Sequence, residues 1–312
     1  MIKMKWNKRL AKAIQKERAY QDQNGRIHIA PSAIGTCLRA IQYREKHIPE
    51  GPLSYYMVRG GLVHDVVEEM IRSANPINTK NVWQKIRKRQ RSLPSEWQLP
   101  LNMIVPEYEK TFRDFLKNDK FGKRIVKAQK LWIETKMEIP LENLSLDLPF
   151  SDEILKKYVI VGIPDIYFKN TILEFKTGEM YNHYYLQGLI YEKMAQLEFK
   201  NSKIRNVIVQ IKPKKVSLAM KGTNRWIKMR AEKEEQLRVE LTLLIANYEK
   251  WAKDLKYQMP RTRTGNCYNC KYYASCFSGI KRRVFAMKYQ MGKLARSLKK
   301  VILRKKRRKE EG

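Results

Sequence analysis

Residues 162–178 have the sequence GIPDIYFKNTILEFKTG, which predicts two short β-strands joined by a tight Lys-Asn turn. The apolar run at residues 159–161, just before them, is typical of a buried strand. Because side chains alternate between the two faces of a strand, Glu174 and Lys176 share the face opposite Phe175. A hairpin that carries two charges inside an apolar strand is therefore the starting point for predicting the fold and the function.

Charged side chains in an apolar strand are costly unless they are paired or bind a metal. Asp165 lies at the end of the first strand of the pair, where its carboxylate can approach Glu174 on the neighbouring strand. Two carboxylates beside Lys176 suit Mg²⁺ or Mn²⁺, which take oxygen ligands and activate water. The pattern of Pro-Asp, eight residues and Glu-x-Lys resembles the PD-(D/E)XK nuclease motif. A surface hairpin with a solvated Glu–Lys pair is the alternative.

The composition points to a polyanionic partner. The chain has 312 residues, which is enough for one large domain or two small ones. Lys plus Arg number 65 against 31 Asp plus Glu, so the net charge is +34. We expect nucleic acid as the partner, with an anionic membrane surface second. No apolar run approaches the roughly 18 residues of a membrane span, and no signal peptide is evident, so we predict a cytoplasmic protein without membrane attachment.

The segments around the hairpin predict an α/β fold. Residues 131–139 and 204–212 have the pattern of strands, and residues 183–199 have that of a helix. A strand, a helix and a strand in this order usually form a parallel, right-handed crossover. We therefore expect a mixed sheet with helices packed on it, and a further long helix at residues 229–258.

Three polar side chains lie at the border of apolar helix faces. His64 follows Gly60 and Gly61 in a predicted helix and borders its apolar stripe. Taken alone, such a histidine is more often a hydrogen-bonded core residue than a metal ligand. Gln187 and Tyr191 are four residues apart on the predicted helix that follows the hairpin, so they face the same way.

The four cysteines have a one-plus-three arrangement, with Cys37 near the start of the chain and Cys267, Cys270 and Cys276 near its end. Four thiolates make a complete tetrahedral set for zinc or for an iron–sulfur cluster. Zinc modules usually offer two close pairs instead. The layout resembles the iron–sulfur staple of RecB-like nucleases, which favours a 4Fe-4S cluster; zinc and free structural thiols are the alternatives.

Together these motifs resemble the CRISPR-associated RecB-like exonucleases (the Cas-four type) of the PD-(D/E)XK superfamily. The resemblance implies one nuclease domain over residues 1–280, stapled by the cluster, with a basic C-terminal extension at 281–312. It extends over about residues 28–280. The matching segments follow the family's order along the chain: residues 32–39 with Cys37, residues 60–64, 162–165, 174–176 and 187–191, and the last three cysteines.

The resemblance also implies roles for individual residues. The ligands that it implies for Mg²⁺ or Mn²⁺ are His64, Asp165, Glu174 and the backbone carbonyl of Phe175. Lys176 would position and polarise the attacking water and stabilise charge on the phosphate. Gln187 and Tyr191 would orient Lys176 and the nucleic-acid backbone. Members of the family degrade single-stranded DNA ends and trim prespacer DNA during CRISPR adaptation, a step of antiviral defence, so DNA and CRISPR adaptation proteins are the partners that it implies.

Two rival functions remain open at this point. A non-catalytic scaffold of the same fold would bind nucleic acid or a CRISPR complex without cleaving DNA, and a zinc-containing DNA-binding regulator would hold zinc in place of iron. The intact set of His64, Asp165, Glu174 and Lys176 argues against the scaffold, which has no need of that chemistry. We therefore predict a metal-dependent DNA exonuclease.

Overall fold

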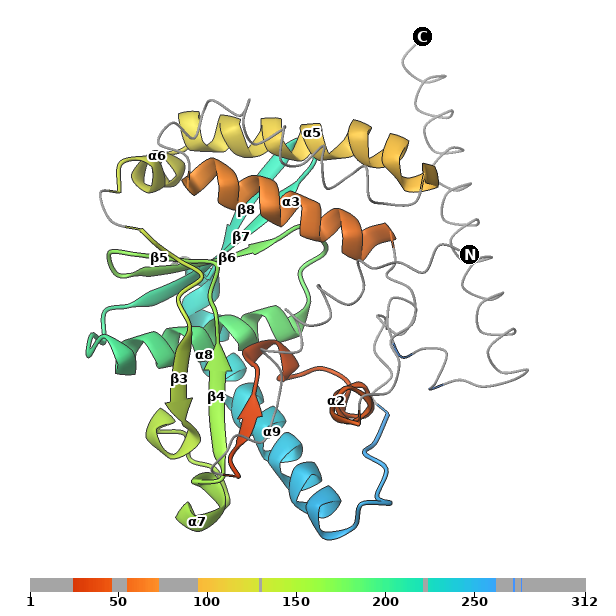
Figure 1. The fold of residues 1–312 in the computed structure, drawn as a ribbon. Coiled ribbons are helices and arrows are strands. Elements are labelled where there is room, and N and C mark those ends of the chain that lie inside the picture. The colour runs from red at the N-terminus through yellow and green to blue at the C-terminus, as the bar shows by residue number, and fades with distance from the viewer. Residues whose placement is uncertain are drawn as a thin grey trace, which may run out of the picture.

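Two mixed sheets and the helices that cover them form the part of the chain described by the computed structural model (Figure 1). The structure describes residues 25–46, 55–72, 95–128, 131–220 and 224–261, together with Tyr272 and Cys276. The predicted α/β class is confirmed. The single mixed sheet is not, because the described strands divide into a three-stranded and a five-stranded sheet.

The five-stranded sheet contains the predicted hairpin. Its strands, in spatial order, are β2 (Trp132–Ile133), β5 (Ile166–Phe168), β6 (Thr171–Lys176), β7 (Arg205–Lys212) and β8 (Lys215–Ala219). Strands β5 and β6 are antiparallel, with Lys169 in the left-handed region (φ 49°) at the turn between them. Strand β7 runs parallel to β6 after the connecting helix α8 (Asn182–Glu198), so the predicted parallel crossover is confirmed. Strand β8 was not predicted from the sequence.

The three-stranded sheet places β4 (Tyr158–Gly162) between β1 (Ile27–Ile29) and β3 (Met137–Pro140). Every residue of β4 is buried, as its apolar run predicts. The prediction of one strand over residues 131–139 is wrong, because β2 and β3 belong to different sheets. The chain bends between them at Glu134, whose φ is 51° and whose backbone N–H donates to the Asp165 carbonyl at 3.2 Å.

Helices and short helical turns complete the described part. Their bounds are η1 (Pro31–Ala33), α2 (Leu38–Glu45), α3 (Tyr55–Arg72), α5 (Ser95–Asn118), α6 (Lys120–Val126), η2 (Leu141–Leu144), α7 (Asp152–Leu155) and α9 (Asn224–Lys253). The last of these is the long helix predicted at 229–258, shifted by about one turn. None of the described helices combines the length and apolar character that a membrane span requires.

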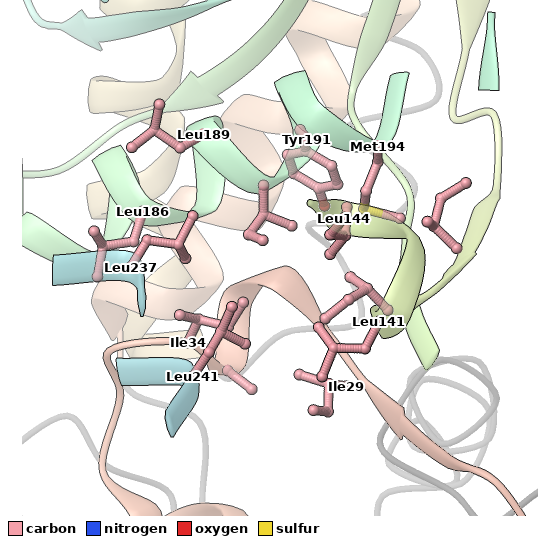
Figure 2. Packing of buried hydrophobic residues seen from close by; sticks show 14 of the residues in the cluster. Ile29, Ile34, Leu141, Leu144, Leu186, Leu189, Tyr191, Met194, Leu237 and Leu241 are labelled. Carbon is pink, nitrogen blue, oxygen red and sulfur yellow. The ribbon is translucent and has the colours of Figure 1, made fainter. Parts of the chain in front are cut away.

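Two hydrophobic cores lie on opposite faces of the five-stranded sheet, with α3 and α5 over one face and α8 over the other (Figure 1). Leu173 and Phe175 of β6 point into the core under α3 and α5. Ile172 points the other way, into the core that α8 and α9 share with the small sheet. Figure 2 shows Leu186 and Leu189 of α8 in this core, with Leu237 and Leu241 of α9. Glu174 and Lys176 therefore face α8, as the alternation along the strand predicts.

Candidate active site

The two carboxylates of the predicted motif lie on neighbouring strands. Ile166 pairs with Leu173 in the β5–β6 ladder, which places Asp165 one position further along, next to Glu174. The Asp165 Oδ2 atom accepts a hydrogen bond of 2.6 Å from the backbone N–H of Phe175. This bond fixes the carboxylate at the end of β6.

Glu174 is almost fully buried, at 4% exposure, and has polar partners on one side only. Its Oε1 atom accepts from Lys176 Nζ at 2.6 Å and from Gln187 Nε2 at 3.0 Å. Within the described residues its other carboxylate oxygen, Oε2, has no hydrogen-bond partner. Leaving a buried carboxylate oxygen unsatisfied is costly, so Oε2 is an atom that could accept a cation.

Helix α3 brings His64 to the same place. Its Nδ1 atom lies 3.9 Å from Asp165 Oδ2, and its ring packs edge-on against Phe175 with centroids 6.4 Å apart. Burial and the positive charge of Lys176 lower the pKa of His64 despite a hydrogen bond to the Phe175 backbone, which raises it. The imidazole is therefore neutral near pH 7, the form in which histidine binds a metal.

Glu68 is a member of the site that the sequence analysis missed. It lies one helical turn after His64 on α3, and His64, Glu68 and Asp165 each offer a ligand atom, all within 4.8 Å of one another. Burial, followed by the negative charges of Glu134 and Asp165, raises the pKa of Glu68 to about 8. The spacing of four residues between His64 and Glu68 was a signal in the sequence that could have found it.

The carboxylates repel one another at this site, and Lys176 compensates for part of this repulsion. Burial raises the pKa of Asp165 to about 6, while Lys176 lowers it. Burial and the charge of Asp165 raise the pKa of Glu174 to about 7. Burial lowers the pKa of Lys176, but Glu174 and Asp165 more than offset this, so its net pKa is raised and it stays charged. A divalent cation would relieve the remaining repulsion.

Gln187 and Tyr191 both lie at the site, where they bond Glu174 and the backbone next to the hairpin. Gln187 donates to Glu174, and the Tyr191 hydroxyl donates to the backbone carbonyl of Ile163 at 3.1 Å. The Tyr191 ring also packs tightly on Gly162, where an added Cβ would lie only 2.6 Å from it. Both side chains therefore position the motif strands, and neither has a described hydrogen bond to Lys176.

The cysteine prediction is only partly within the described residues. Cys37 is the N-cap residue of α2, and Cys276 donates its backbone N–H to the Tyr272 carbonyl at 2.9 Å. Cys267 and Cys270 lie outside the described residues. The Tyr272 ring nevertheless packs edge-on against Tyr43 of α2, with centroids 5.9 Å apart. Tyr272, which lies between Cys270 and Cys276 in the sequence, therefore contacts the helix that begins directly after Cys37.

Hydrogen bonds also tie α2 to the end of the described chain. Arg39 donates from Nε to the Met259 carbonyl at 2.6 Å, and from its backbone N–H to the Pro260 carbonyl at 3.2 Å. Gln42 bonds the backbone of Tyr257 and of Met259. These bonds hold the residues that lead into the cysteine-rich stretch beside Cys37.

Comparisons with known proteins assign no family to this geometry. No protein-family model matches the chain, and no curated protein sequence matches it. Among solved structures, one match is described as the "Crystal structure of SSO0001". It has 12% sequence identity and a TM-score of 0.36, and the match covers 88% of this chain and 94% of that chain. A structural similarity at that TM-score does not support an assignment of fold family or function. The function of the site must therefore be inferred from its side chains.

Proposed function

We propose that this protein is a metal-dependent nuclease that hydrolyses DNA phosphodiester bonds, with a core of the PD-(D/E)XK type. The observation that carries the proposal is the buried Glu174, with one carboxylate oxygen unsatisfied in the described structure, beside the half-buried Asp165 and Lys176. A solvated surface pair would not bury Glu174 to this extent. The burial therefore favours the nuclease over the surface-hairpin alternative.

The donor set fits Mg²⁺ or Mn²⁺. Carboxylate oxygens suit both ions, and a neutral imidazole is better tolerated by Mn²⁺ than by Mg²⁺. His64, Asp165 and Glu68 offer ligand atoms close enough together to hold the cation. Glu174 and the backbone carbonyl of Phe175 are the further ligands that the family resemblance implies. A bound cation would supply an activated water and offset negative charge on the phosphate.

The protein's own contribution is positional and electrostatic. Lys176 keeps its ammonium group at the site through its 2.6 Å bond to Glu174, and there it would orient a water and stabilise charge on the phosphate. Gln187 donates to the same oxygen, Oε1, so both contacts leave Oε2 of Glu174 to the cation. Tyr191 fixes the strand ends through Ile163.

The substrate and setting follow from the charge and from the family resemblance. A net charge of +34 supports binding to DNA through phosphate contacts. Single-stranded DNA ends, prespacer trimming with CRISPR adaptation proteins, and a cytoplasmic location are the proposals that the resemblance adds. The division into a nuclease domain at 1–280 and a basic extension at 281–312 also stays a proposal.

We also propose that Cys37, Cys267, Cys270 and Cys276 hold a structural 4Fe-4S cluster. The ring contact between Tyr43 and Tyr272 supports this, since Tyr272 lies between Cys270 and Cys276 in the sequence and contacts the helix that follows Cys37. Zinc remains the alternative metal. Iron and acid-labile sulfide analysis of anaerobically purified protein distinguishes the two, because zinc would come without sulfide.

The nuclease assignment is tested with end-labelled single- and double-stranded DNA under anaerobic conditions, with and without Mn²⁺. We expect cleavage that requires the metal in the wild-type protein and no cleavage by Lys176→Ala. The matched control is Lys212→Ala, which removes an exposed lysine of the same sheet that pairs with Glu179 at 3.1 Å. DNA binding without cleavage by the wild-type protein would instead support the non-catalytic scaffold.

A further inference from the structure

A group of aromatic rings lies beside the candidate active site and has no role in the chemistry proposed above. It consists of Tyr181, His183 and Tyr184, which lie at the start of α8, and we call it the aromatic shelf. The Lys176 Nζ atom lies 4.7 Å from the centroid of the Tyr184 ring. The shelf therefore begins at the lysine that bonds Glu174 and extends from it toward the surface.

All three rings of the shelf contact one another, including Tyr181 and Tyr184, which lie edge-on with centroids 5.7 Å apart. His183 lies edge-on to Tyr184, with centroids 4.3 Å apart, and is stacked on Tyr181, with centroids 5.7 Å apart and planes only 7° apart. Tyr181 is the outermost member and is 38% exposed. Tyr181 is therefore the ring of the shelf that a flat ligand ring would reach from solvent.

The electrostatics of the shelf suit a nucleobase attached to a phosphate backbone. Burial and the charge of Lys176 lower the pKa of His183 to about 4, so its ring is neutral at pH 7. Glu179 is the one carboxylate in residues 177–185, and it pairs with Lys212 at 3.1 Å. A phosphate near Lys176 and a base on neutral aromatic rings are the two contacts that single-stranded nucleic acid makes with stacking platforms.

Simple structural roles account for only part of the shelf. Tyr181 is the N-cap residue of α8 but makes no side-chain capping hydrogen bond. His183 does pack inward, since its Cβ lies 3.3 Å from a Cβ built on Gly35. Tyr185, on the same helical turn, stacks instead on Trp226 with centroids 5.8 Å apart. Tyr181 packs against His183 and Tyr184 but is 38% exposed, so part of its ring remains open to a ligand.

We propose that the aromatic shelf is a base-stacking subsite that holds a nucleotide of single-stranded DNA next to the scissile phosphate. The proposal rests on the nuclease function proposed above and adds a substrate determinant to it. It accounts for a preference for single strands, because a base paired within a duplex cannot leave its stack without an additional energetic cost. Tyr181 is a specificity residue in this proposal and takes no part in bond cleavage.

The test measures binding of a fluorescent single-stranded oligonucleotide to the full-length protein without divalent cations, so that no cleavage occurs. Tyr181→Leu should weaken binding roughly tenfold, within the range that base–aromatic stacking supplies, and Tyr181→Phe should bind like the wild type. The slope of affinity against salt concentration should stay the same in both variants, since no phosphate contact is lost. Tyr185→Leu is the matched control and should bind like the wild type.

A second arm moves a single abasic position through the oligonucleotide. When the abasic position falls on the shelf, the affinity of the wild-type protein should fall by the same factor of roughly ten. The affinity of Tyr181→Leu, which already lacks the stacking contact, should not fall further. The proposal would be overturned if the abasic site lowered the affinity of the wild type and of Tyr181→Leu equally at every position. It would also be overturned if Tyr181→Leu bound the intact oligonucleotide as tightly as the wild type does. Thermal melts exclude misfolding as the cause, and a folded Tyr181→Phe protein that binds as weakly as Tyr181→Leu would also overturn it.

The outcomes for the shelf and for the nuclease are separable. If Tyr181→Leu and an abasic site at one position are non-additive in their effect on affinity, but the protein does not cleave DNA in Mn²⁺, the shelf proposal is supported and the nuclease proposal is refuted. Metal-dependent cleavage together with normal binding by Tyr181→Leu would refute the shelf and leave the nuclease in place. If the wild-type protein does not bind single-stranded DNA, the shelf proposal is wrong.

Discussion

Replacing Asp165 by Asn removes one negative charge from the site and keeps an oxygen that can accept the Phe175 N–H. Burial raises the pKa of Asp165 from 3.8 to about 6, so ionising it costs more in the folded than in the unfolded protein. The difference corresponds to about 3 kcal/mol when the group is fully ionised in both states. The folded protein binds more protons than the unfolded one in this range, so wild-type stability falls as the pH rises.

The magnitude between two practical pH values follows from the same two pKa values. At pH 5 the unfolded state is mostly ionised and the folded state mostly protonated, so about half of the cost is already present. From pH 5 to pH 8 the wild-type protein should lose about 1 kcal/mol that Asp165→Asn does not lose. Comparing the two proteins at two pH values cancels any effect of the amide that does not depend on pH.

The assay is urea unfolding of the metal-free proteins at both pH values, repeated with Mn²⁺. At a Mn²⁺ concentration 100 times its dissociation constant, the wild type should gain about 2.7 kcal/mol and Asp165→Asn little or nothing. Glu142→Gln, which alters an exposed carboxyl on η2, is the control and should follow the wild type. A pH-independent difference between Asp165→Asn and the wild type, or equal stabilisation of both by Mn²⁺, would refute this account of the site.

Three further predictions concern other parts of the protein. His64→Ala should weaken Mn²⁺ binding and cleavage with little change in melting temperature; a lower melting temperature with normal Mn²⁺ affinity by calorimetry would make it a core histidine. Cys37→Ser should lose the broad visible absorbance of the cluster and melt earlier, and full iron and sulfide content would exclude Cys37 as a ligand. Deleting residues 284–312 should weaken DNA binding and flatten its salt dependence, whereas an unchanged salt slope would mean that this segment does not touch DNA.

The hairpin and its charged face were predictable because they depend on local patterns. Alternation along β6 fixes which side chains share a face, and the turn residues between the strands fix the register of Glu174 beside Asp165. The parallel position of β7 followed from the length of the α8 crossover. These features need no knowledge of distant contacts.

Other features depend on tertiary contacts that the pattern does not contain. The strand predicted at 131–139 divides because Glu134 adopts a left-handed conformation and bonds the Asp165 carbonyl, and each half then pairs with a different sheet. Glu68 joins the site only because α3 crosses the end of the hairpin with that face inward. A propensity argument cannot supply the direction in which a helix crosses a sheet.

The hydrogen bonds between α2 and residues 257–260 also constrain the order in which the chain can fold during synthesis. Arg39 and its partner Met259 are 220 residues apart in the sequence. At typical translation rates of 5–20 residues per second, Met259 is synthesised roughly 10 to 45 s after Arg39. Strand β1 likewise pairs with β4, whose residues are synthesised long after it. The N-terminal segment therefore stays incompletely paired on the ribosome while the hairpin and its crossover are made. A chaperone or the ribosome surface has that interval in which to protect Ile29, Ile34 and Ile41, which end up buried.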